Sequence, residues 1–214
     1  MGITEPTLPS YFFGETPLEG VSHLPLVETI FIKPSIHSLS DFDFLIITSK
    51  RSIMALQSFD YDFKSIKLFC VGEKTAAFAK SQGLNVVHVS KGYAKDLIAE
   101  IRPQIKGLKG LYLRPKTVAN HYISDYVNQG LLQELVCYET KCLTKRPSTF
   151  EQPARLLFSA PSQVECFLKH FNFHVEDKVM VIGKTTADAL PQGVGFTIAS
   201  KPSLALMCKE VLDI

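Results

Sequence analysis

The sequence lacks the features that mark several large classes of protein. No apolar run approaches the length of a membrane span, and the first residues do not form a basic-then-apolar signal segment. The formal net charge is only +2 and charges of both signs are interspersed, so the chain has no basic arm for nucleic acid. We therefore expect neither a membrane nor a nucleic acid as a partner.

Metal and disulfide signatures are missing as well. The six histidines are scattered singly, and none is paired with another histidine or a cysteine at metal-site spacing. The five cysteines are odd in number and include no C-x-x-C pair. Cys70 and Cys166 stand among apolar neighbours, so we expect both to pack as small hydrophobic side chains. This pattern suits a reducing compartment and predicts a cytoplasmic protein without a metal site.

One tripeptide suggests a nucleotide-binding loop, and its context excludes it. Gly183-Lys184-Thr185 looks like the end of a Walker A loop, but that loop needs a glycine five positions earlier, where Lys178 stands. Residues 179–182 also have the pattern of a strand rather than a loop. No G-x-G-x-x-G follows any expected strand, so a dinucleotide cofactor has no support either.

What the sequence does contain is one stretch that occurs twice. One apolar run stops at Gly72 and continues as Glu-Lys-Thr-Ala; a second stops at Gly183 and continues as Lys-Thr-Thr-Ala. Each copy has the pattern of a buried parallel strand that leads into the first turn of a helix. The offset is constant, since 159−48, 183−72 and 186−75 all give 111. We infer two related α/β units.

Strands and helices alternate along most of the chain. The expected strands span residues 11–13, 26–32, 44–48, 68–71, 86–89, 110–113, 132–138, 155–158, 179–182 and 196–199. The expected helices span residues 50–59, 75–82, 94–105, 118–129, 162–171, 185–190 and 204–212. This alternation predicts an α/β fold with two doubly wound parallel sheets of the flavodoxin-like kind.

The division into domains follows from a shortage of strands. The second half of the chain supplies three strands after residue 150, too few for a complete sheet. The N-terminal strands at residues 11–13 and 26–32 would complete it. We therefore predict one discontinuous α/β domain of residues 1–33 and 143–214, with residues 36–138 inserted as a second. Two chain crossings, near residues 30–36 and 137–145, would join them.

Hydroxyl groups and cations gather where the strands are expected to end. Thr75 and Thr186 fall in the first turns of two helices, where free backbone N–H groups favour an anion by about 0.3–1 kcal/mol. The alternative is that each threonine only caps its helix, but two copies at matched positions favour ligand binding. Solvated surface charge is the ordinary role of each cation, but their shared position favours an anionic substrate. These cations are Lys50, Arg51, Lys74, Arg114, Lys116, Lys184 and Lys201.

An ordered set of short motifs resembles the uroporphyrinogen-III synthase family. Thr-Ser at 48–49, Gly-Glu-Lys-Thr-Ala at 72–76, Leu-Arg at 113–114 and Val-Cys-Tyr-Glu-Thr at 136–140 come first. Ser-Ala-Pro-Ser at 159–162, Gly-Lys-Thr-Thr-Ala at 183–187 and Ser-Lys-Pro-Ser at 200–203 follow in the family's order. Each motif is weak alone; the ordered set is specific and extends from about residue 11 to the end.

The resemblance implies two α/β domains joined by a two-stranded linker, with a ligand cleft between them. The implied substrate is hydroxymethylbilane, a linear tetrapyrrole bearing eight carboxylates. The implied reaction is ring closure with inversion of the last pyrrole and loss of water, giving uroporphyrinogen III. No cofactor and no metal are implied, and we expect a monomer that acts on this small molecule.

The resemblance also assigns site residues. Tyr138 falls on the family's cleft tyrosine, often proposed to assist departure of the substrate hydroxyl; judged alone, it would be a packing residue with a solvated hydroxyl. Thr48, Ser49, Thr75, Ser159 and Thr186 fall on the family's hydroxyl positions. With the helix-end glycines and cations, the predicted substrate-binding set is Thr48, Ser49, Lys50, Gly72, Lys74, Thr75, Arg114, Ser159, Gly183, Lys184, Thr185 and Thr186.

Three departures from the family pattern stand out. Glu15-Thr16-Pro17 replaces the usual Thr-Arg-Pro turn, the first crossover helix is nearly absent, and Ala160 replaces a hydroxyl residue.

The alternative function is that of a non-catalytic two-domain protein that binds a small anionic ligand, because such a protein would have the same fold. Turnover distinguishes the two, because a binding protein would close on its ligand without changing the isomer formed.

Overall fold

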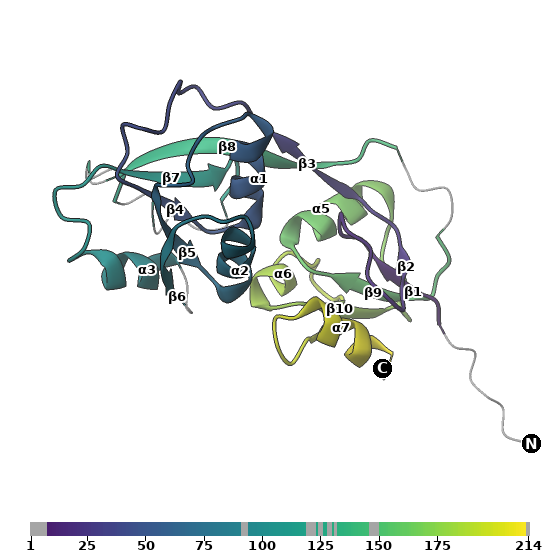
Figure 1. Cartoon of the computed structure of the whole chain (residues 1–214). Coiled ribbons are helices and arrows are strands. Elements are labelled where there is room, and N and C mark those ends of the chain that lie inside the picture. The colour runs from purple at the N-terminus through teal and green to yellow at the C-terminus, as the bar shows by residue number, and fades with distance from the viewer. Residues whose placement is uncertain are drawn as a thin grey trace, which may run out of the picture. The chain divides into compact units, whose positions relative to one another are not determined.

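The computed structural model describes residues 8–90, 94–118, 123, 126–127, 130, 132–145 and 150–212 (Figure 1). The chain divides into two compact units. Unit 1 is Met1–Glu28 with Thr140–Ile214, and unit 2 is Thr29–Glu139. Each unit contains one sheet with helices packed on it, and the central strands of each sheet are parallel. The predicted α/β fold with parallel sheets is confirmed.

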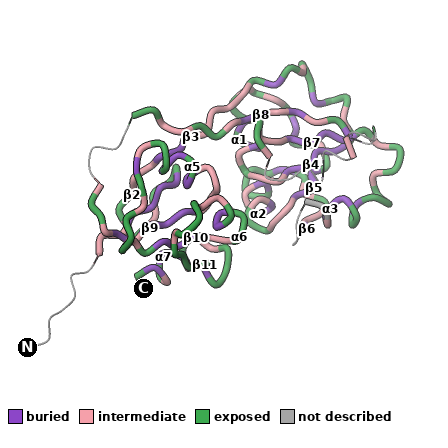
Figure 2. The backbone as a smooth tube through the Cα atoms, turned by 180° about the vertical axis from the view of Figure 1, so that it is seen from behind, coloured by how far each residue is buried: buried purple, intermediate pink, exposed green. Residues whose placement is uncertain are grey.

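Unit 2 is built on a sheet with the strand order β3-β8-β7-β4-β5-β6. The strands are β3 (Val27–Phe31), β4 (Phe44–Ile47), β5 (Lys67–Val71), β6 (Val86–Ser90), β7 (Gly110–Pro115) and β8 (Gln133–Cys142). The helices are α1 (Lys50–Ser58), α2 (Glu73–Ser81) and α3 (Ala94–Ile101). One face of the sheet packs against apolar residues of α1 and α2, and the other face packs against apolar residues of α3. Each residue of β4 is therefore buried (Figure 2).

Unit 1 is built on a sheet with the strand order β11-β10-β9-β1-β2. The strands are β1 (Ser10–Phe12), β2 (Ser22–His23), β9 (Arg155–Phe158), β10 (Lys178–Val181) and β11 (Phe196–Ile198). The helices are α5 (Pro161–His170), α6 (Lys184–Ala187) and α7 (Leu204–Val211). One face packs on α5 and α6 through stacked and edge-on phenylalanines. The other face is covered by α7 and, in place of a crossover helix, by Leu18 and Val21.

The two sheets have the same spatial arrangement but a different chain order. In unit 1, β1 and β2 precede the three repeated strands; in unit 2, the equivalent β7 and β8 follow them. The registers agree, since Leu45 pairs with Leu111 as Leu156 pairs with Tyr11. Each unit therefore combines two strands from one repeat with three strands from the other, and β3 is a sixth strand at the edge of the sheet of unit 2.

The strands β3 and β8 carry the chain from one unit to the other and obey the same repeat. The boundary between the units falls within both strands. Ile32 N donates to Cys137 O, and Leu143 N donates to Leu26 O, each at 2.9 Å. Both partners are related by the repeat, because 143−32 and 137−26 equal 111. The repeat thus includes the connecting strands.

One strand was assigned to the wrong sheet by the sequence pattern. The expected strand at residues 26–32 does not complete the sheet of unit 1; it forms β3, which pairs with β8 in the sheet of unit 2. The short, polar β2 completes the sheet instead, and two residues without apolar alternation give no strand signal. The expected helix at 118–129 lies largely outside the described residues.

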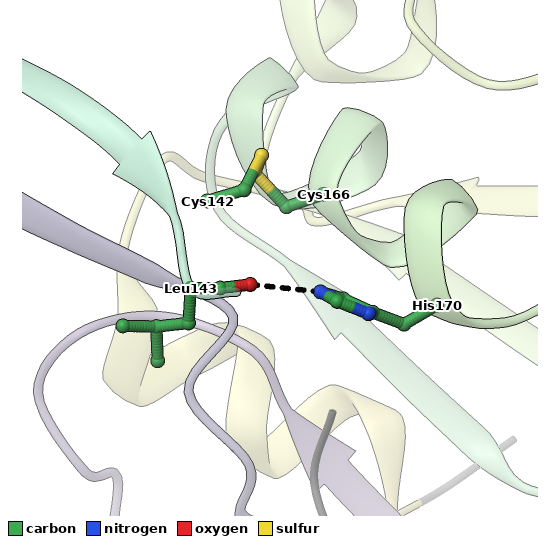
Figure 3. The surroundings of a disulfide bond; sticks show 4 residues. All are labelled: Cys142, Leu143, Cys166 and His170. Carbon is green, nitrogen blue, oxygen red and sulfur yellow. Dashed lines mark hydrogen bonds between the residues drawn. A yellow bond between two sulfur atoms is a disulfide. The ribbon is translucent and has the colours of Figure 1, made fainter. Parts of the chain in front are cut away.

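Cys166 does not pack as a free thiol, which makes that prediction wrong. It forms a disulfide with Cys142 at the end of β8, with a Cα–Cα distance of 5.3 Å (Figure 3). Beside it, His170 Nε2 lies 2.8 Å from the carbonyl oxygen of Leu143. The helix α5 is thus tied to the end of β8 by a covalent bond and a hydrogen bond. The remaining cysteines, Cys70, Cys137 and Cys208, are buried free thiols.

Candidate functional site

The predicted site residues lie where parallel strands end in each unit. In unit 2, Thr48 and Ser49 follow β4, and Gly72 follows β5. In unit 1, Ser159 follows β9 and Gly183 follows β10. The carboxyl ends of parallel strands share one edge of a sheet, so each unit gathers its own set of hydroxyl groups and helix starts there.

The turn from β4 to α1 is fixed by its own hydroxyl residues. Ser49 is the N-cap of α1, and its Oγ accepts a hydrogen bond of 3.2 Å from the backbone N–H of Arg51. Thr48 and Ser49 are half-buried, whereas Lys50 is exposed. The cap satisfies one backbone donor of the first turn. The turn therefore holds two hydroxyls in place beside an exposed cation.

Tyr138 is a buried tyrosine at this edge. Only 6% of it is exposed, and it pairs with Pro115 of β7. Burial raises the pKa of Tyr138 above its usual value, although the Ser49 side chain and the charge of Arg51 act in the opposite direction. The phenol is therefore protonated at neutral pH and able to donate a proton.

A second tyrosine, Tyr112, lies at the same edge, and the sequence interpretation missed it. It is also 6% exposed, and it pairs with Ile46 of β4. Burial raises the pKa of Tyr112 too, with Thr48 and Arg114 opposing the shift. In the sequence it stands inside the apolar run of β7 and reads as core. The only signal was the polar handle of a tyrosine where the other strand residues are aliphatic.

Arg114 is held by the fold itself. Its Nη2 donates to Glu134 Oε1 at 2.7 Å, and its Nη1 donates to the carbonyl oxygens of Pro115 and Lys116 at 2.9 and 3.1 Å. The side chain is 18% exposed, and the carboxylate neutralises its charge. Its predicted role in substrate binding thus competes with a visible structural role, which is to fix the turn after β7.

The helices α2 and α6 begin at glycines, not at the predicted threonines. Gly72 and Gly183 are the N-caps and make no side-chain cap, and Thr75 and Thr186 sit at the third helical position. The alternative that these threonines only cap their helices is therefore wrong. Thr186 is 3% exposed, and Thr75 is half-buried.

The first residues of these two helices differ in charge. The exposed Lys184 and Thr185 open α6, whereas the exposed Glu73 and Lys74 open α2. A carboxylate ligand is favoured by a cation at a helix start and disfavoured by an anion there. The start of α6 therefore suits an anion better than the start of α2.

Ser159, which follows β9, is hydrogen-bonded to a glutamine that the sequence interpretation also missed. Gln163, 5% exposed, accepts from the Ser159 N–H at 2.7 Å and donates to Ser159 Oγ at 2.9 Å. Ala160 is the N-cap of α5 and provides no side-chain cap. Ser159 retains its own O–H for donation to a ligand.

The part of the chain that the structure describes has neither a metal-binding cluster nor a membrane-spanning helix. That part of the chain contains no group of three or more histidine, cysteine, aspartate or glutamate residues placed to hold a metal ion. None of the described helices is long and apolar enough to cross a membrane.

Comparison with known proteins gives one family model and several solved structures. The family model for "Uroporphyrinogen-III synthase HemD" matches residues 19–208. The structure of uroporphyrinogen-III synthetase from Helicobacter pylori 26695 aligns with a TM-score of 0.82 at 24% identity, covering 96% of this chain and 99% of that one. A mutant uroporphyrinogen III synthase from Thermus thermophilus aligns with a TM-score of 0.55 at 16% identity, covering 96% and 99%. No curated protein sequence matches the chain.

Proposed function

The chain belongs to the uroporphyrinogen-III synthase family, and on this premise we propose that it closes hydroxymethylbilane to uroporphyrinogen III. Family membership makes it an enzyme of tetrapyrrole synthesis. The proposed reaction inverts the terminal pyrrole and releases water, which is hydro-lyase chemistry. The proposed substrate is a linear tetrapyrrole polycarboxylate, and no cofactor is required, because an electron-rich pyrrole can itself expel a hydroxyl group.

The observation that carries the chemistry is the burial of Tyr138, which raises the pKa of its phenol. Departure of the substrate hydroxyl requires a proton, and a phenol with a raised pKa keeps one at neutral pH. Tyr138 would donate that proton as the carbon–oxygen bond breaks, so that water leaves. The pyrrole carbon that forms the new carbon–carbon bond loses a proton, which would restore the phenol. Protons and electrons then balance over one turnover.

The substrate carboxylates call for anion sites, and both units offer them at strand ends. The start of α6 presents Lys184, Thr185 and Thr186, and the start of α2 presents Lys74 and Thr75. Lys50, Ser49 and Ser159 add a cation and hydroxyl donors at the neighbouring strand ends. We propose that these groups bind substrate carboxylates. Arg114 would contribute mainly by fixing the turn after β7.

The test is conversion of freshly generated hydroxymethylbilane, with the products separated by isomer. The unassisted substrate closes without inversion to the type I isomer. We expect the purified chain to accelerate closure and to give the type III isomer. Closure at the unassisted rate to type I alone would reject the enzyme and leave the non-catalytic anion-binding protein as the better interpretation.

The proposed setting is a cytoplasmic monomer without nucleic-acid or membrane partners. The Cys142–Cys166 bond is unusual for that setting, because disulfides persist mainly in oxidising compartments. Light scattering on the purified protein tests the oligomeric state. Thiol trapping in intact cells, followed by counting of unmodified cysteines, tests whether the pair is reduced where the protein works.

A further inference from the structure

The strand end of β9 in unit 1 carries a serine that is bonded twice to one buried glutamine. Gln163 lies in the first turn of α5 and is 5% exposed. Its Oε1 accepts from the Ser159 N–H at 2.7 Å, and its Nε2 donates to Ser159 Oγ at 2.9 Å. A backbone N–H can only donate, so it must face the oxygen end of the amide. The nitrogen end is therefore the one that meets the Ser159 hydroxyl.

The amide of Gln163 is also held by the neighbouring strand. Gly14 follows β1, and a Cβ there would clash with the Phe12 ring and lie 3.1 Å from Gln163 Nε2. The position therefore needs a glycine, because its backbone packs closely against the glutamine. The carbonyl oxygen of Gly14 lies 2.8 Å from His23 Nε2. Packing from one side and the two bonds to Ser159 from the other fix the orientation of the amide.

The bond to the Ser159 hydroxyl does not cap a helix. In a capping box, the N-cap hydroxyl accepts from a helix N–H, and the Glu or Gln at the third helical position reaches back to the N-cap N–H. The N-cap of α5 is Ala160, and it provides no side-chain cap. Ser159 stands one residue earlier, and its oxygen accepts from the glutamine instead. The Nε2 bond thus serves the serine hydroxyl rather than the helix.

Unit 2 forms the equivalent turn without a glutamine. Thr48 is the equivalent of Ser159, because 159−48 is 111. By the same offset, Ser52 is the equivalent of Gln163. Ser52 donates to the carbonyl oxygen of Leu113 at 3.1 Å. The framework therefore does not require this amide, and burying it costs free energy unless it is hydrogen-bonded. Its presence in unit 1 calls for a reason other than the fold.

We propose that Gln163 is a positioning residue for substrate binding that acts through Ser159. The inference rests on the proposed function. A serine hydroxyl has one O–H and two lone pairs, and Gln163 Nε2 occupies one lone pair. The O–H therefore points away from the glutamine, and the accepted hydrogen bond polarises it into a better donor. A substrate carboxylate suits this donor, because an ionised carboxylate can only accept.

The first test is Gln163→Leu, which keeps a side chain of similar size and removes the amide. The Ser159 hydroxyl can then rotate, so KM should rise by about two- to tenfold, the range for one lost neutral hydrogen bond. The kcat should stay near wild type, because Ser159 is not proposed to touch the bond that breaks.

Gln163→Glu tests the direction of the hydrogen bond. A carboxylate at this position keeps the acceptor for the Ser159 N–H but would take the Ser159 O–H for itself. We expect KM to rise more than in Gln163→Leu, by about 10- to 100-fold, since the bond lost is one to a charged group. A glutamine that only stabilises the turn predicts the reverse order, because Leu removes that acceptor and Glu retains it.

Ser159→Ala separates the hydroxyl from the charge that the glutamate introduces. In the Ser159→Ala background, Gln163→Leu should leave KM unchanged, and the remaining effect of Gln163→Glu measures charge repulsion alone. The matched control is Ser52→Ala in unit 2, which should keep the wild-type KM. Melting temperatures show that each variant is folded.

Two results would overturn the inference. One is a Gln163→Leu enzyme with the wild-type KM, and the other is an equal effect of Gln163→Leu with and without the Ser159 hydroxyl. Failure of the proposed function looks different, because the wild type itself would then form no type III product.

Discussion

The strand ends of the two units share a geometry and differ in chemistry. Unit 2 carries Tyr112 and Tyr138 where unit 1 carries Phe12 and, at the repeat offset of 111 residues, Val27. Unit 1 opens its short helix with Lys184, where unit 2 opens the equivalent helix with Glu73. At these positions the buried phenols are in unit 2, and the helix start that suits an anion better is in unit 1. We propose on this basis that the two copies of one framework perform different tasks.

The largest predicted effect removes the chemistry of unit 2. Tyr138→Phe should lower kcat by about 10²–10⁴, with the lower end expected because the pyrrole already helps to expel the hydroxyl. The ring and its packing remain, so the melting temperature should stay near wild type. The rate and the III-to-I isomer ratio are the measurements. A Tyr138→Phe enzyme with full rate and pure type III product would show that Tyr138 has only a packing role, and it would contradict the proposed difference between the units.

The same residue predicts a pH dependence. Burial raises the pKa of Tyr138 above the usual value of about 10. A raised pKa means that the folded state favours the protonated phenol. This stabilisation is complete below the unfolded pKa and is lost as the pH rises through the folded pKa. Loss of activity through this group is thus expected only above about pH 10, and an absorbance titration of tyrosinate in wild type against Tyr138→Phe would locate it.

The next prediction concerns how each unit holds the end of its connecting strand. Unit 1 uses the Cys142–Cys166 disulfide, whereas the equivalent positions in unit 2 are Phe31 and Ala55, which pack in one apolar cluster. For a sequence separation of 24 residues, the bond is expected to add about 3 kcal/mol to the free energy of unfolding. Cys142→Ser with Cys166→Ala should lose that amount in denaturant titrations, as should wild type in reductant.

The double variant itself should not respond to reductant, which serves as the control. Thiol counting in denaturant gives an independent check. With the bond formed, the chain should show three reactive thiols, those of Cys70, Cys137 and Cys208. All five cysteines reacting without reductant would contradict the pairing.

A further prediction compares Thr75 and Thr186, the two threonines at matched helix positions. A lost hydrogen bond to a charged group costs about 1.5–3 kcal/mol, so each Thr→Val change should lower kcat/KM by about 10- to 150-fold if the hydroxyl meets a carboxylate. Thr186→Val should have the larger effect, because Thr186 is almost completely buried and Thr75 is half-buried. Wild-type kinetics for both variants would exclude the threonines from substrate binding.

The smallest predicted effect comes from the charges that open α6 and α2. Lys184→Glu should weaken substrate binding and Glu73→Lys should strengthen it, each by about two- to fivefold, as expected for about 0.3–1 kcal/mol at an exposed helix start. Both effects should shrink as salt is added, because exposed charges are screened. Measuring KM at two ionic strengths tests this. Equal responses to both changes would show that the two helix starts are not different anion sites.

Local patterns were sufficient to predict most elements of the fold. The buried strands β4, β5, β9 and β10 and the amphipathic helices α1 and α5 agree with the expected ranges to within two residues. The partner of a strand is a different matter, because pairing depends on distant parts of the chain. The strong signal of β3 could therefore be read correctly as a strand and still be placed in the wrong sheet.

The candidate site was predictable where the repeat marked it and not elsewhere. Gly72, Gly183 and the threonines after them stood out because they recur at a fixed offset. Tyr112 did not, because it stands in an ordinary apolar strand and only the sheet register places it opposite Ile46 of β4. Cys142 and Cys166 likewise meet only through the fold, and no spacing rule links them. Contacts between distant residues are set by sheet register, which the sequence pattern leaves open.

The exchange of strands between repeats has a consequence for the origin and assembly of the chain. A cut between α3 and β7 would give two fragments of similar length, and neither would contain all the strands of either sheet. The fragments would have to fold around each other, like the protomers of a strand-exchanged dimer. Tandem fusion of two such protomers replaces their dependence on concentration with a covalent tether. The offset of 111 residues and the exchanged strands are what such a fusion would leave in the chain.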